Sequence, residues 1–294
     1  MTAATAVAGS AALGPQRWKA EDPSFPPALL EIRYPPKQLW TIGDRSVLEA
    51  PCVAIVGTRR MTAYGERSTR RLATAFARAG ACVVSGMAQG IDATAHRATI
   101  EAGGRTVAVL GTGVDVPYPA GHRRLHAEIA RAGCVVSEME PGKRAGPGCF
   151  PRRNRLIAGL ASVTIVVEAP DKSGALLTAA EADQAHRIVA AVPGPIDSAQ
   201  SAGTNRLLRD GAQVIASVND ALTLVGLTPE PEPIPTLRPT EQKIWDALKE
   251  LDAAPAELIA ARCGIELRET LGAITALEIA GLVTYDLSGS IRRR

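Results

Sequence analysis

The sequence predicts an α/β protein with a doubly wound, mostly parallel sheet, followed by a small winged-helix domain. Two observations predict the sheet. Short β-branched runs alternate with Ala- and Arg-rich helical stretches, and each run is continuously apolar, which is typical of strands that helices cover on both faces. Seven runs have this character: residues 52–57, 82–86, 106–111, 134–138, 163–168, 188–193 and 212–216.

Proline-rich segments set the expected domain boundaries. Residues 1–51 lack a sustained periodicity and contain repeated prolines, which favours extended chain over helix. Proline recurs at every second position from Pro229 to Pro235, a pattern that neither a helix nor a central strand tolerates. We therefore expect a Pro-rich arm over residues 1–51, the sheet domain over 52–227, a linker over 228–238 and the winged-helix domain over 239–294.

The last of these segments has the pattern of three helices and a hairpin. Helices are expected from Thr240, over residues 255–262 and over 266–280, with Gly281 as the C-cap of the third. A short hairpin is expected over residues 282–291. Three short helices followed by a hairpin are typical of a winged helix.

Composition and cysteine spacing exclude several classes of protein. The chain has 294 residues, of which 46% are hydrophobic and 21% charged, as in a globular protein. Its apolar runs are far shorter than the ~20 residues of a membrane-spanning helix. The five cysteines are scattered and never spaced C-x-x-C, so we expect no metal site, no disulfide framework and a reducing, cytoplasmic environment. No G-x-G-x-x-G or G-x-x-x-x-G-K-[ST] motif occurs, and we expect no cofactor.

Small residues and arginines lie where the first three strands are expected to end. They occupy residues 57–60, 85–92 and 111–113, and they include Arg59 and Arg60. In an open parallel sheet, ligands bind beyond the carboxyl ends of the strands, where helix N-termini attract anions. The segments therefore predict a phosphate-binding site, although sharp strand-to-helix turns equally explain each glycine alone.

The densest cluster of charge is Phe-Pro-Arg-Arg-Asn-Arg at residues 150–155, where the helix before the fifth strand is expected to begin. Cations at a helix N-terminus are unfavourable by about a few tenths of a kcal/mol each, so an anionic ligand would compensate them. The alternative is that Arg152 and Arg153 are solvated while Arg155 pairs with Glu138 or Glu168.

Two other pairs of residues have a structural and a functional interpretation. Ser173 is a candidate helix N-cap, and Gly174 allows a ligand to approach closely. Asp92 and His96 lie four residues apart on an expected helix, which suits either acid–base catalysis or a hydrogen-bonded couple. We favour the couple because no nucleophile accompanies the pair, and we expect no catalytic residues.

Taken in register, these motifs resemble the DNA-processing protein A family, DprA or Smf, from Val53 to about Ala221. The specific blocks are S-G-M-A-Q-G-I-D at 85–92 and F-P-R-R-N-R at 150–155, and shorter matches lie at 57–59, 64–65, 95–96, 118–119, 137–138, 173–174, 193–194 and 203–205. Residues 276–283 are similar to the winged-helix domain that many members carry. The resemblance implies an extended Rossmann-like fold for the sheet domain. Many members also have a helical module before that domain, for which residues 1–51 are too short and too rich in proline.

The resemblance further implies a dimeric protein that is not an enzyme. It would bind single-stranded DNA, protect incoming DNA and load the RecA recombinase onto it during natural transformation or recombination. The DNA-binding residues that it implies are Gly57, Thr58, Arg59, Ser85, Gly86, Phe150, Arg153, Asn154 and Arg155, with Lys143 as an addition and Ser173 and Gly174 in a family block near the pocket.

The distribution of charge agrees with a polyanionic ligand. Residues 52–227 contain 20 basic and 14 acidic residues, and 18 of the basic residues are Arg, which either reflects phosphate binding or a GC-rich coding bias. Residues 236–294 contain 8 basic and 9 acidic residues, so we expect them to contact protein rather than duplex DNA. Aromatic residues make up only 3% of the chain, which predicts affinity from phosphate contacts with few stacked bases.

Two other functions remain open at the level of sequence. One is a nucleotide-processing enzyme similar to the phosphoribohydrolases, with Glu138 or Glu168 as its carboxylate, although the P-G-G-x-G-T block of those enzymes is missing. The other is a winged-helix transcription regulator, which the acidic C-terminal segment disfavours. The DNA-binding hypothesis predicts that Arg59→Ala and Arg155→Ala each weaken single-stranded DNA binding and reduce its salt dependence.

Overall fold

The computed structural model describes residues 14–228, 237–286 and 289–293. The chain divides into two compact units, Met1–Glu230 and Pro231–Arg294. The division falls inside the segment expected to be a linker, residues 228–238, of which residues 229–236 lie outside the described residues.

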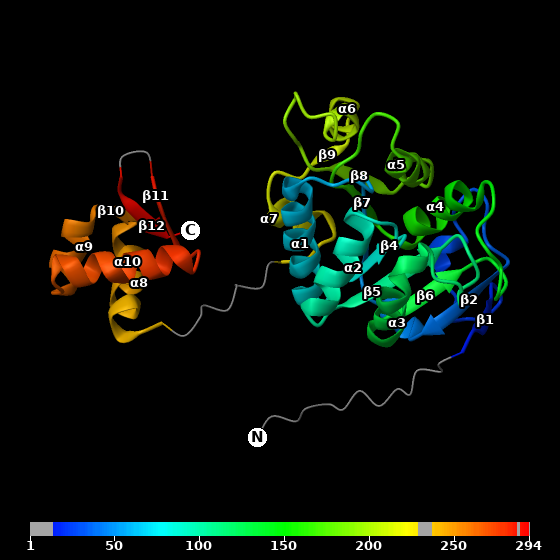
Figure 1. The fold of residues 1–294 in the computed structure, drawn as a ribbon, viewed down its shortest axis with the longest axis horizontal. Helices are drawn as coiled ribbons and strands as arrows, with labels where there is room; N and C mark the ends of the chain where they lie inside the picture. Colours follow the sequence, from blue (N-terminus) through cyan, green and yellow to red (C-terminus); the bar gives the residue numbers. More distant parts are fainter. Residues whose placement is uncertain (1–13, 229–236, 287–288, 294) are drawn as a thin grey trace, which may run out of the picture. The chain divides into compact units, whose positions relative to one another are not determined.

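A nine-stranded sheet forms the centre of the first unit (Figure 1). All seven predicted apolar runs contain a strand, β3 to β9. The strands are β1 (Gln16–Lys19), β2 (Gln38–Gly43), β3 (Cys52–Val56), β4 (Cys82–Ser85), β5 (Arg105–Leu110), β6 (Cys134–Ser137), β7 (Val163–Val166), β8 (Ile188–Ala191) and β9 (Gln213–Val214).

The sheet has the strand order β1-β2-β6-β5-β4-β3-β7-β8-β9. Strands β3 to β9 are all parallel to their neighbours within this group, and only β1 and β2 pair antiparallel. From β3 the chain winds first toward β6 and later, from β7, in the opposite direction. The predicted doubly wound, mostly parallel sheet is confirmed, and its switch point lies between β3 and β7, where such sheets bind ligands.

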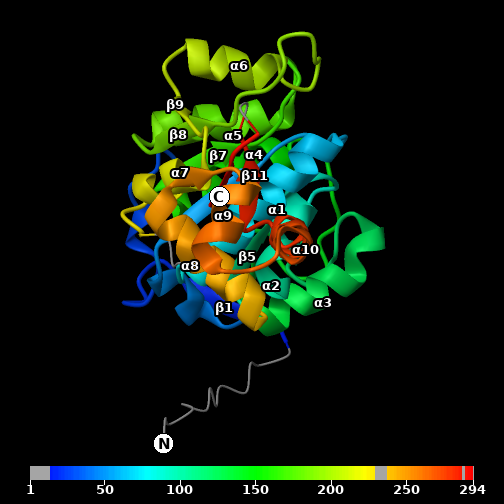
Figure 2. The same cartoon turned by 90° about the vertical axis from the view of Figure 1, so that its left-hand side faces the viewer.

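Helices cover both faces of this sheet, as the apolar strands require. Alternate residues of β3 illustrate the two layers: Val53 and Ile55 pack under α1, α2 and α7, whereas Ala54 and Val56 pack under α4 and α5. Helix α6 lies beside β8 at the far edge (Figure 2). The helices are α1 (Ala63–Arg78), α2 (Ile91–Glu101), α3 (Arg123–Ala132), α4 (Cys149–Leu160), α5 (Gly174–Gln184), α6 (Ala202–Arg209) and α7 (Val218–Leu224).

The prediction that residues 1–51 form an extended arm is wrong for the described residues 14–51. Strand β2 pairs antiparallel with β6, and β1 pairs with β2, so this segment extends the sheet. Trp18, Leu29 and Leu39 are fully buried against the α4 side of the sheet. The prolines of this segment lie outside its strands, most of them in the connection between β1 and β2, where they leave the ladder of hydrogen bonds intact.

The residues that the structure describes in the second unit form three helices and a three-stranded sheet of order β10-β12-β11. Its elements are α8 (Pro239–Leu251), β10 (Ala253–Ala254), α9 (Ala256–Cys263), α10 (Leu267–Ile279), β11 (Val283–Tyr285) and β12 (Ile291–Arg293). The three helices and the hairpin appear as predicted, whereas the two-residue strand β10 was not expected. Trp245 and Ile274 lie in the core, and the Arg293 guanidinium packs 3.7 Å from the centre of the Trp245 ring.

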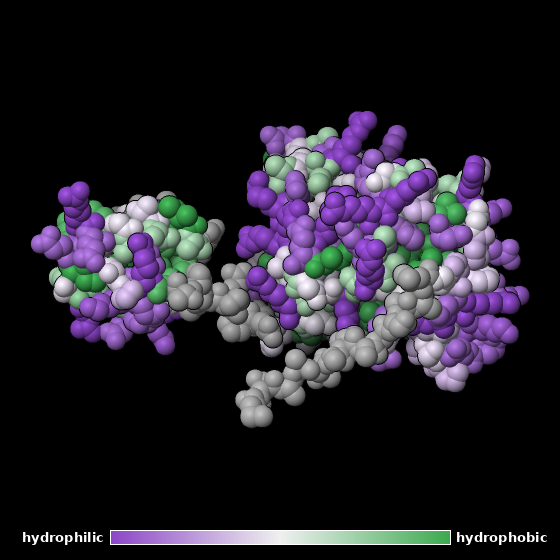
Figure 3. All heavy atoms as spheres, turned by 60° about the horizontal axis from the view of Figure 1, so that its bottom comes forward, coloured by the Kyte–Doolittle hydropathy of each residue, from purple (hydrophilic) through white to green (hydrophobic). Residues whose placement is uncertain are grey.

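No helix in the described parts of the chain combines the length and the hydropathy that crossing a bilayer requires. The face of the larger unit shown in Figure 3 is mostly hydrophilic, and its hydrophobic residues lie in small, separate patches.

Candidate functional site

Three segments meet at the carboxyl ends of β3 and β7. The turn after β3, the first turns of α4 and the start of α5 enclose a cavity of about 450 Å³. A smaller hollow of about 250 Å³ adjoins it and shares Arg59, Phe150 and Arg153. We call the two together the strand-end pocket. Its polar, aromatic and glycine lining residues are Gly57, Thr58, Arg59, Arg60, Gly86, Gln89, Asp92, Tyr118, Phe150, Arg153, Asn154, Ser173, Gly174 and Thr178.

Backbone hydrogen bonds fix the turn that carries Arg59. The Thr58 N–H donates to the carbonyl of Glu168 at 2.7 Å, and the Thr58 carbonyl accepts from the Ile91 N–H at 3.2 Å. Both partners lie near the ends of neighbouring elements, β7 and α2. Arg59 and Arg60 extend from this anchored turn with exposed side chains, and the structure gives neither an ion pair within its described residues. The turn therefore presents two uncompensated positive charges.

Arg153 supplies a third positive charge, but from a buried position. Its Nη1 donates to the carbonyl of Gly86 at 2.9 Å and to the carbonyl of Val109, which ties α4 to the ends of β4 and β5. Gly86 permits this approach, because a Cβ atom there would lie 2.5 Å from Nη1. The pKa of Arg153 is lowered to about 10, mainly by burial; the carboxyl of Asp92 acts in the opposite direction, and the charge of Arg59 adds to the lowering. Arg153 therefore stays protonated at neutral pH.

Asn154 and Ser173 connect α4 to the first turn of α5. Asn154 Nδ2 donates to the Gly174 carbonyl at 3.4 Å, and its Oδ1 accepts from Arg153 Nε at 3.3 Å. Ser173 is the N-cap of α5, since its hydroxyl accepts from the Ala175 N–H at 3.3 Å. Gly174 is exposed, and no atom lies within 4 Å of where a Cβ would stand. The positive end of the α5 dipole thus faces the pocket.

An aromatic pair lines the smaller hollow. The rings of Tyr118 and Phe150 have centroids 4.8 Å apart at an interplanar angle of 36°. Tyr118 is 40% exposed, so part of its ring is accessible to a ligand. The sequence analysis did not place Tyr118 in the site, because Tyr118 lies on the loop after β5, far from Phe150 along the chain. The Tyr-Pro match to the family at residues 118–119 was the signal that could have indicated it.

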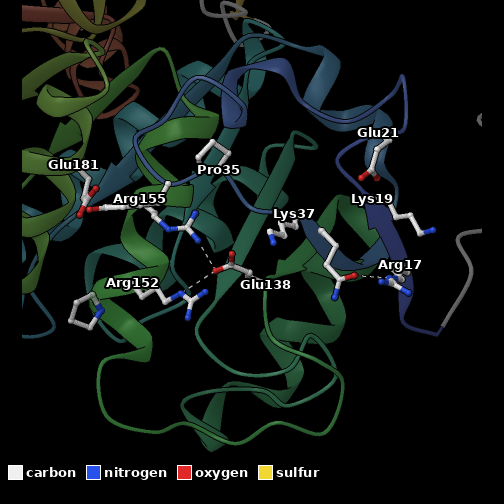
Figure 4. Close-up of a pocket in the computed structure, with 12 residues that line it drawn as sticks. Arg17, Lys19, Glu21, Pro35, Lys37, Glu138, Arg152, Arg155 and Glu181 are labelled. Carbon is white, nitrogen blue, oxygen red and sulfur yellow. Dashed lines mark hydrogen bonds and ion pairs between the residues drawn. The ribbon is translucent and has the colours of Figure 1, made fainter.

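Three of the predicted site residues do not line the strand-end pocket. Ser85 is fully buried, and its hydroxyl donates to the Ile55 carbonyl at 2.7 Å. Lys143 is exposed on the loop before α4. Arg155 lies on the other side of α4 and pairs with Glu138, with 2.6 Å between Nη2 and Oε2 (Figure 4). The alternative interpretation of Arg155, an ion pair with Glu138, is the one that the structure shows.

Helical geometry explains why residues 150–155 do not act as one cluster. Residues three and four apart share a helix face, so Phe150, Arg153 and Asn154 face the strand-end pocket. Arg152 and Arg155 face the opposite side, where both guanidinium groups approach Glu138, Arg152 at 3.3 Å.

Asp92 and His96 do not form the expected couple. The Asp92 carboxylate accepts from the Gly86 N–H at 3.1 Å, and burial raises the pKa of Asp92. His96 Nδ1 lies 2.7 Å from the Thr106 hydroxyl, which donates in turn to the Val83 carbonyl. Burial, together with the nearby charges of Arg153, His122 and Arg97, lowers the pKa of His96 to about 3, so His96 is neutral.

The other two acidic groups that sequence reasoning considered are also engaged. Glu168 is buried and accepts from the Thr62 N–H at 2.9 Å and from its hydroxyl at 2.5 Å, at the N-terminus of α1. Within the residues that the structure describes, no group of three or more His, Cys, Asp or Glu side chains is arranged to hold a metal ion.

Comparisons with known proteins identify a family for each of the two units. Residues 16–226 match the DNA recombination-mediator protein A family, and residues 228–285 match the DprA winged helix domain. The first match includes β1 and β2, which the sequence-based resemblance from Val53 onward had left out.

Named relatives and solved structures belong to the same group. The putative DNA processing protein DprA of Mycobacterium tuberculosis (strain ATCC 25618 / H37Rv) is 43% identical over 259 residues, which cover 85% of this chain and 67% of that protein. The X-ray structure of DNA processing protein A from Streptococcus pneumoniae has a TM-score of 0.68 and 38% identity over 71% of this chain and 73% of that chain. A structure of DNA processing protein A from Helicobacter pylori, which concerns the single-stranded DNA binding mode of that protein, has a TM-score of 0.64. The two sequences are 34% identical, and the match covers 70% of this chain and 94% of that chain. This chain therefore belongs to the DNA recombination-mediator protein A family, whose members are also named DprA or Smf.

Proposed function

We propose that this protein binds single-stranded DNA in the strand-end pocket and acts as a recombination mediator. In this proposal it is a cytoplasmic homodimer without enzymatic activity, and it protects incoming DNA and loads RecA onto it. The observation that carries the proposal is that one pocket combines two arginines without an ion pair among the described residues, a buried arginine that is charged at neutral pH, a helix N-terminus and an aromatic pair.

These groups suit the two chemical components of a nucleotide. Arg59, Arg60 and the N-terminus of α5 offer charge and N–H donors to phosphate oxygens. Tyr118 and Phe150 offer ring faces to a base. The binding residues that we propose are Gly57, Thr58, Arg59, Gly86, Tyr118, Phe150, Arg153, Asn154, Ser173 and Gly174. The Helicobacter pylori relative, which binds single-stranded DNA, supports this assignment.

A single strand fits this arrangement better than a duplex. The aromatic pair lines a hollow of only about 250 Å³ beneath the loops. A base must leave its stack to reach such a hollow, which is inexpensive in a single strand but breaks a pair in a duplex. The phosphate contacts carry no sequence information, so binding should tolerate any sequence.

The enzyme alternative has little support in the geometry. A phosphoribohydrolase needs a carboxylate that can reach its substrate, but Glu138 is paired with two arginines and Glu168 caps α1. Asp92 lines the pocket, yet its carboxylate is held by the Gly86 N–H.

One titration tests the binding proposal against both alternatives. Labelled single-stranded and duplex oligonucleotides are titrated over a series of salt concentrations, and nucleoside monophosphate hydrolysis is measured in parallel. The proposal expects preference for the single strand, strong salt dependence and no turnover. Hydrolysis would favour the enzyme, and duplex preference would favour a transcription regulator.

The mediator role and the homodimer need separate measurements. Light scattering of the purified protein gives its mass, and a monomer at all concentrations would contradict the dimer. For loading, the rate at which RecA forms filaments on coated single-stranded DNA is measured with and without the protein. Faster nucleation, lost when Arg59 is replaced by Ala, supports the role, and an unchanged rate contradicts it.

A further inference from the structure

A second, larger cavity lies on the opposite side of α4 from the strand-end pocket. It has a volume of about 1210 Å³, and the segment from β1 to the start of β2 forms its other wall (Figure 4). Five cationic and three acidic side chains line it. They are Arg17, Lys19, Lys37, Arg152 and Arg155, with Glu21, Glu138 and Glu181.

The positive charges of this second cavity are incompletely balanced. Glu138 alone faces both Arg152 and Arg155. Lys19 and Lys37 are exposed, and neither forms an ion pair with any residue that the structure describes. The cavity therefore attracts anions.

Within the second cavity, Arg155 is the residue at which we expect an anion to bind. The residue is only 7% exposed, yet its Nη1 has no hydrogen-bond partner within the described residues, while Nη2 is bound to Glu138. Leaving a buried, charged N–H group without an acceptor is unfavourable, so such groups are normally satisfied. A phosphate oxygen that enters beside Glu138 is an acceptor of the kind that Arg155 lacks.

The second cavity and the strand-end pocket flank the first turn of α4. Pro151 lines both, with Phe150 and Arg153 on one side and Arg152 and Arg155 on the other. A ligand with regularly spaced phosphates can occupy both cavities at once, whereas a single phosphate can occupy only one. Tyr34, which is 61% exposed at the rim, offers an additional face for a base.

We propose that a single strand bound in the strand-end pocket continues over the first turn of α4 into the second cavity. There Lys19, Lys37 and Arg155 contact its phosphates. This inference rests on the proposed function, and it adds that the binding site is longer than one pocket and includes the N-terminal strands.

The test compares short and long oligonucleotides on a double variant. Lys19→Ala/Lys37→Ala removes two exposed charges and should leave the fold intact, which thermal unfolding checks. Oligodeoxythymidylates of about 6 and about 20 nucleotides, chosen to occupy one cavity or both, are titrated over a salt series. Arg71→Ala/Arg97→Ala, which removes two exposed charges on α1 and α2 outside both cavities, is the matched control.

The expected loss follows from counterion release. Each phosphate contact on a single strand contributes about 0.7 to the slope of log affinity against log salt, so two lost contacts should reduce the slope by about 1.4 and the affinity about 25-fold at about 0.1 M salt. This loss should appear with the long oligonucleotide, and binding of the short one and the control variant should match wild type.

Each contrary outcome has its own meaning. If the lysine variant binds the long oligonucleotide like wild type, or loses affinity equally for both lengths, the continued path is wrong while the proposed function stands. If wild type binds neither oligonucleotide, the proposed function fails and the path fails with it. Calorimetry with inorganic phosphate tests whether the second cavity binds a free anion instead. If wild type binds phosphate saturably and the lysine variant does not, while the variant keeps the wild-type affinity for the long oligonucleotide, the cavity is a free-anion site and the continued path is wrong.

Discussion

Replacing Arg59 by Ala should weaken single-stranded DNA binding and leave the fold stable. The side chain is exposed on an anchored turn and has no ion pair or side-chain hydrogen bond within the described residues, so its removal breaks no polar interaction that the structure gives. Its positive charge also contributes to the lowered pKa of Arg153, and the variant relieves that repulsion. A loss of affinity would therefore report on the ligand and not on damage to the pocket.

The magnitude follows from one phosphate contact. Losing it should reduce the slope of log affinity against log salt by about 0.7 and the affinity about fivefold at about 0.1 M salt. Fluorescence anisotropy of a labelled oligodeoxythymidylate, measured over a salt series, gives both quantities. Thermal unfolding of the same samples checks stability, and Arg71→Ala, an exposed cation on α1, controls for the change in net charge.

Two results would refute this reasoning. If Arg59→Ala retains the wild-type affinity and salt slope, Arg59 does not contact a phosphate. If Arg71→Ala shows the same loss, the effect belongs to the overall charge and not to the strand-end pocket.

Three further changes test the pocket and its support. Gly86→Ala places a Cβ 2.5 Å from the Arg153 guanidinium, and should lower the free energy of unfolding by about 1–3 kcal/mol in chemical denaturation. Phe150→Ala should weaken DNA binding by roughly 1–3 kcal/mol per stacked base, with an unchanged salt slope in the anisotropy titration. His96 has a folded pKa of about 3. Because unfolded histidine binds its proton near pH 6.5, the free energy of unfolding should fall by about 1.4 kcal/mol per unit as the pH decreases below that value. Denaturation at several pH values should show this slope reduced in His96→Gln, and retained in His186→Asn, which alters an exposed histidine.

The two N-terminal strands, β1 and β2, could not be predicted from the sequence. The central strands could be predicted from their continuous apolar runs, because both faces of a parallel sheet are buried. Strands β1 and β2 are separated by a proline-rich connection, and they are specified by the pairing of β1 with β2 and of β2 with β6. That pairing joins residues that are far apart in the chain, from Gly43 to Cys134 for example, and leaves little trace in local composition.

The site was predicted with similar limits. Gly57, Arg59, Phe150 and Arg153 were correctly expected near one another, because parallel strands deliver their carboxyl ends to one edge. Arg155 was grouped with them from its position in the motif, although the helical repeat already separates it from Arg153 by slightly more than half a turn.

By itself, the sequence determined the α/β class, the seven parallel strands, the winged helix and the strand-end position of the pocket that we propose as the binding site, because periodicity and turn residues act over a few neighbours. Only the tertiary structure decided which side chains share a cavity. It buried Ser85, paired Arg155 with Glu138 and brought Tyr118 against Phe150. Those outcomes depend on contacts between segments distant in sequence, and such contacts are selected by packing and by the need of each buried polar group for a partner.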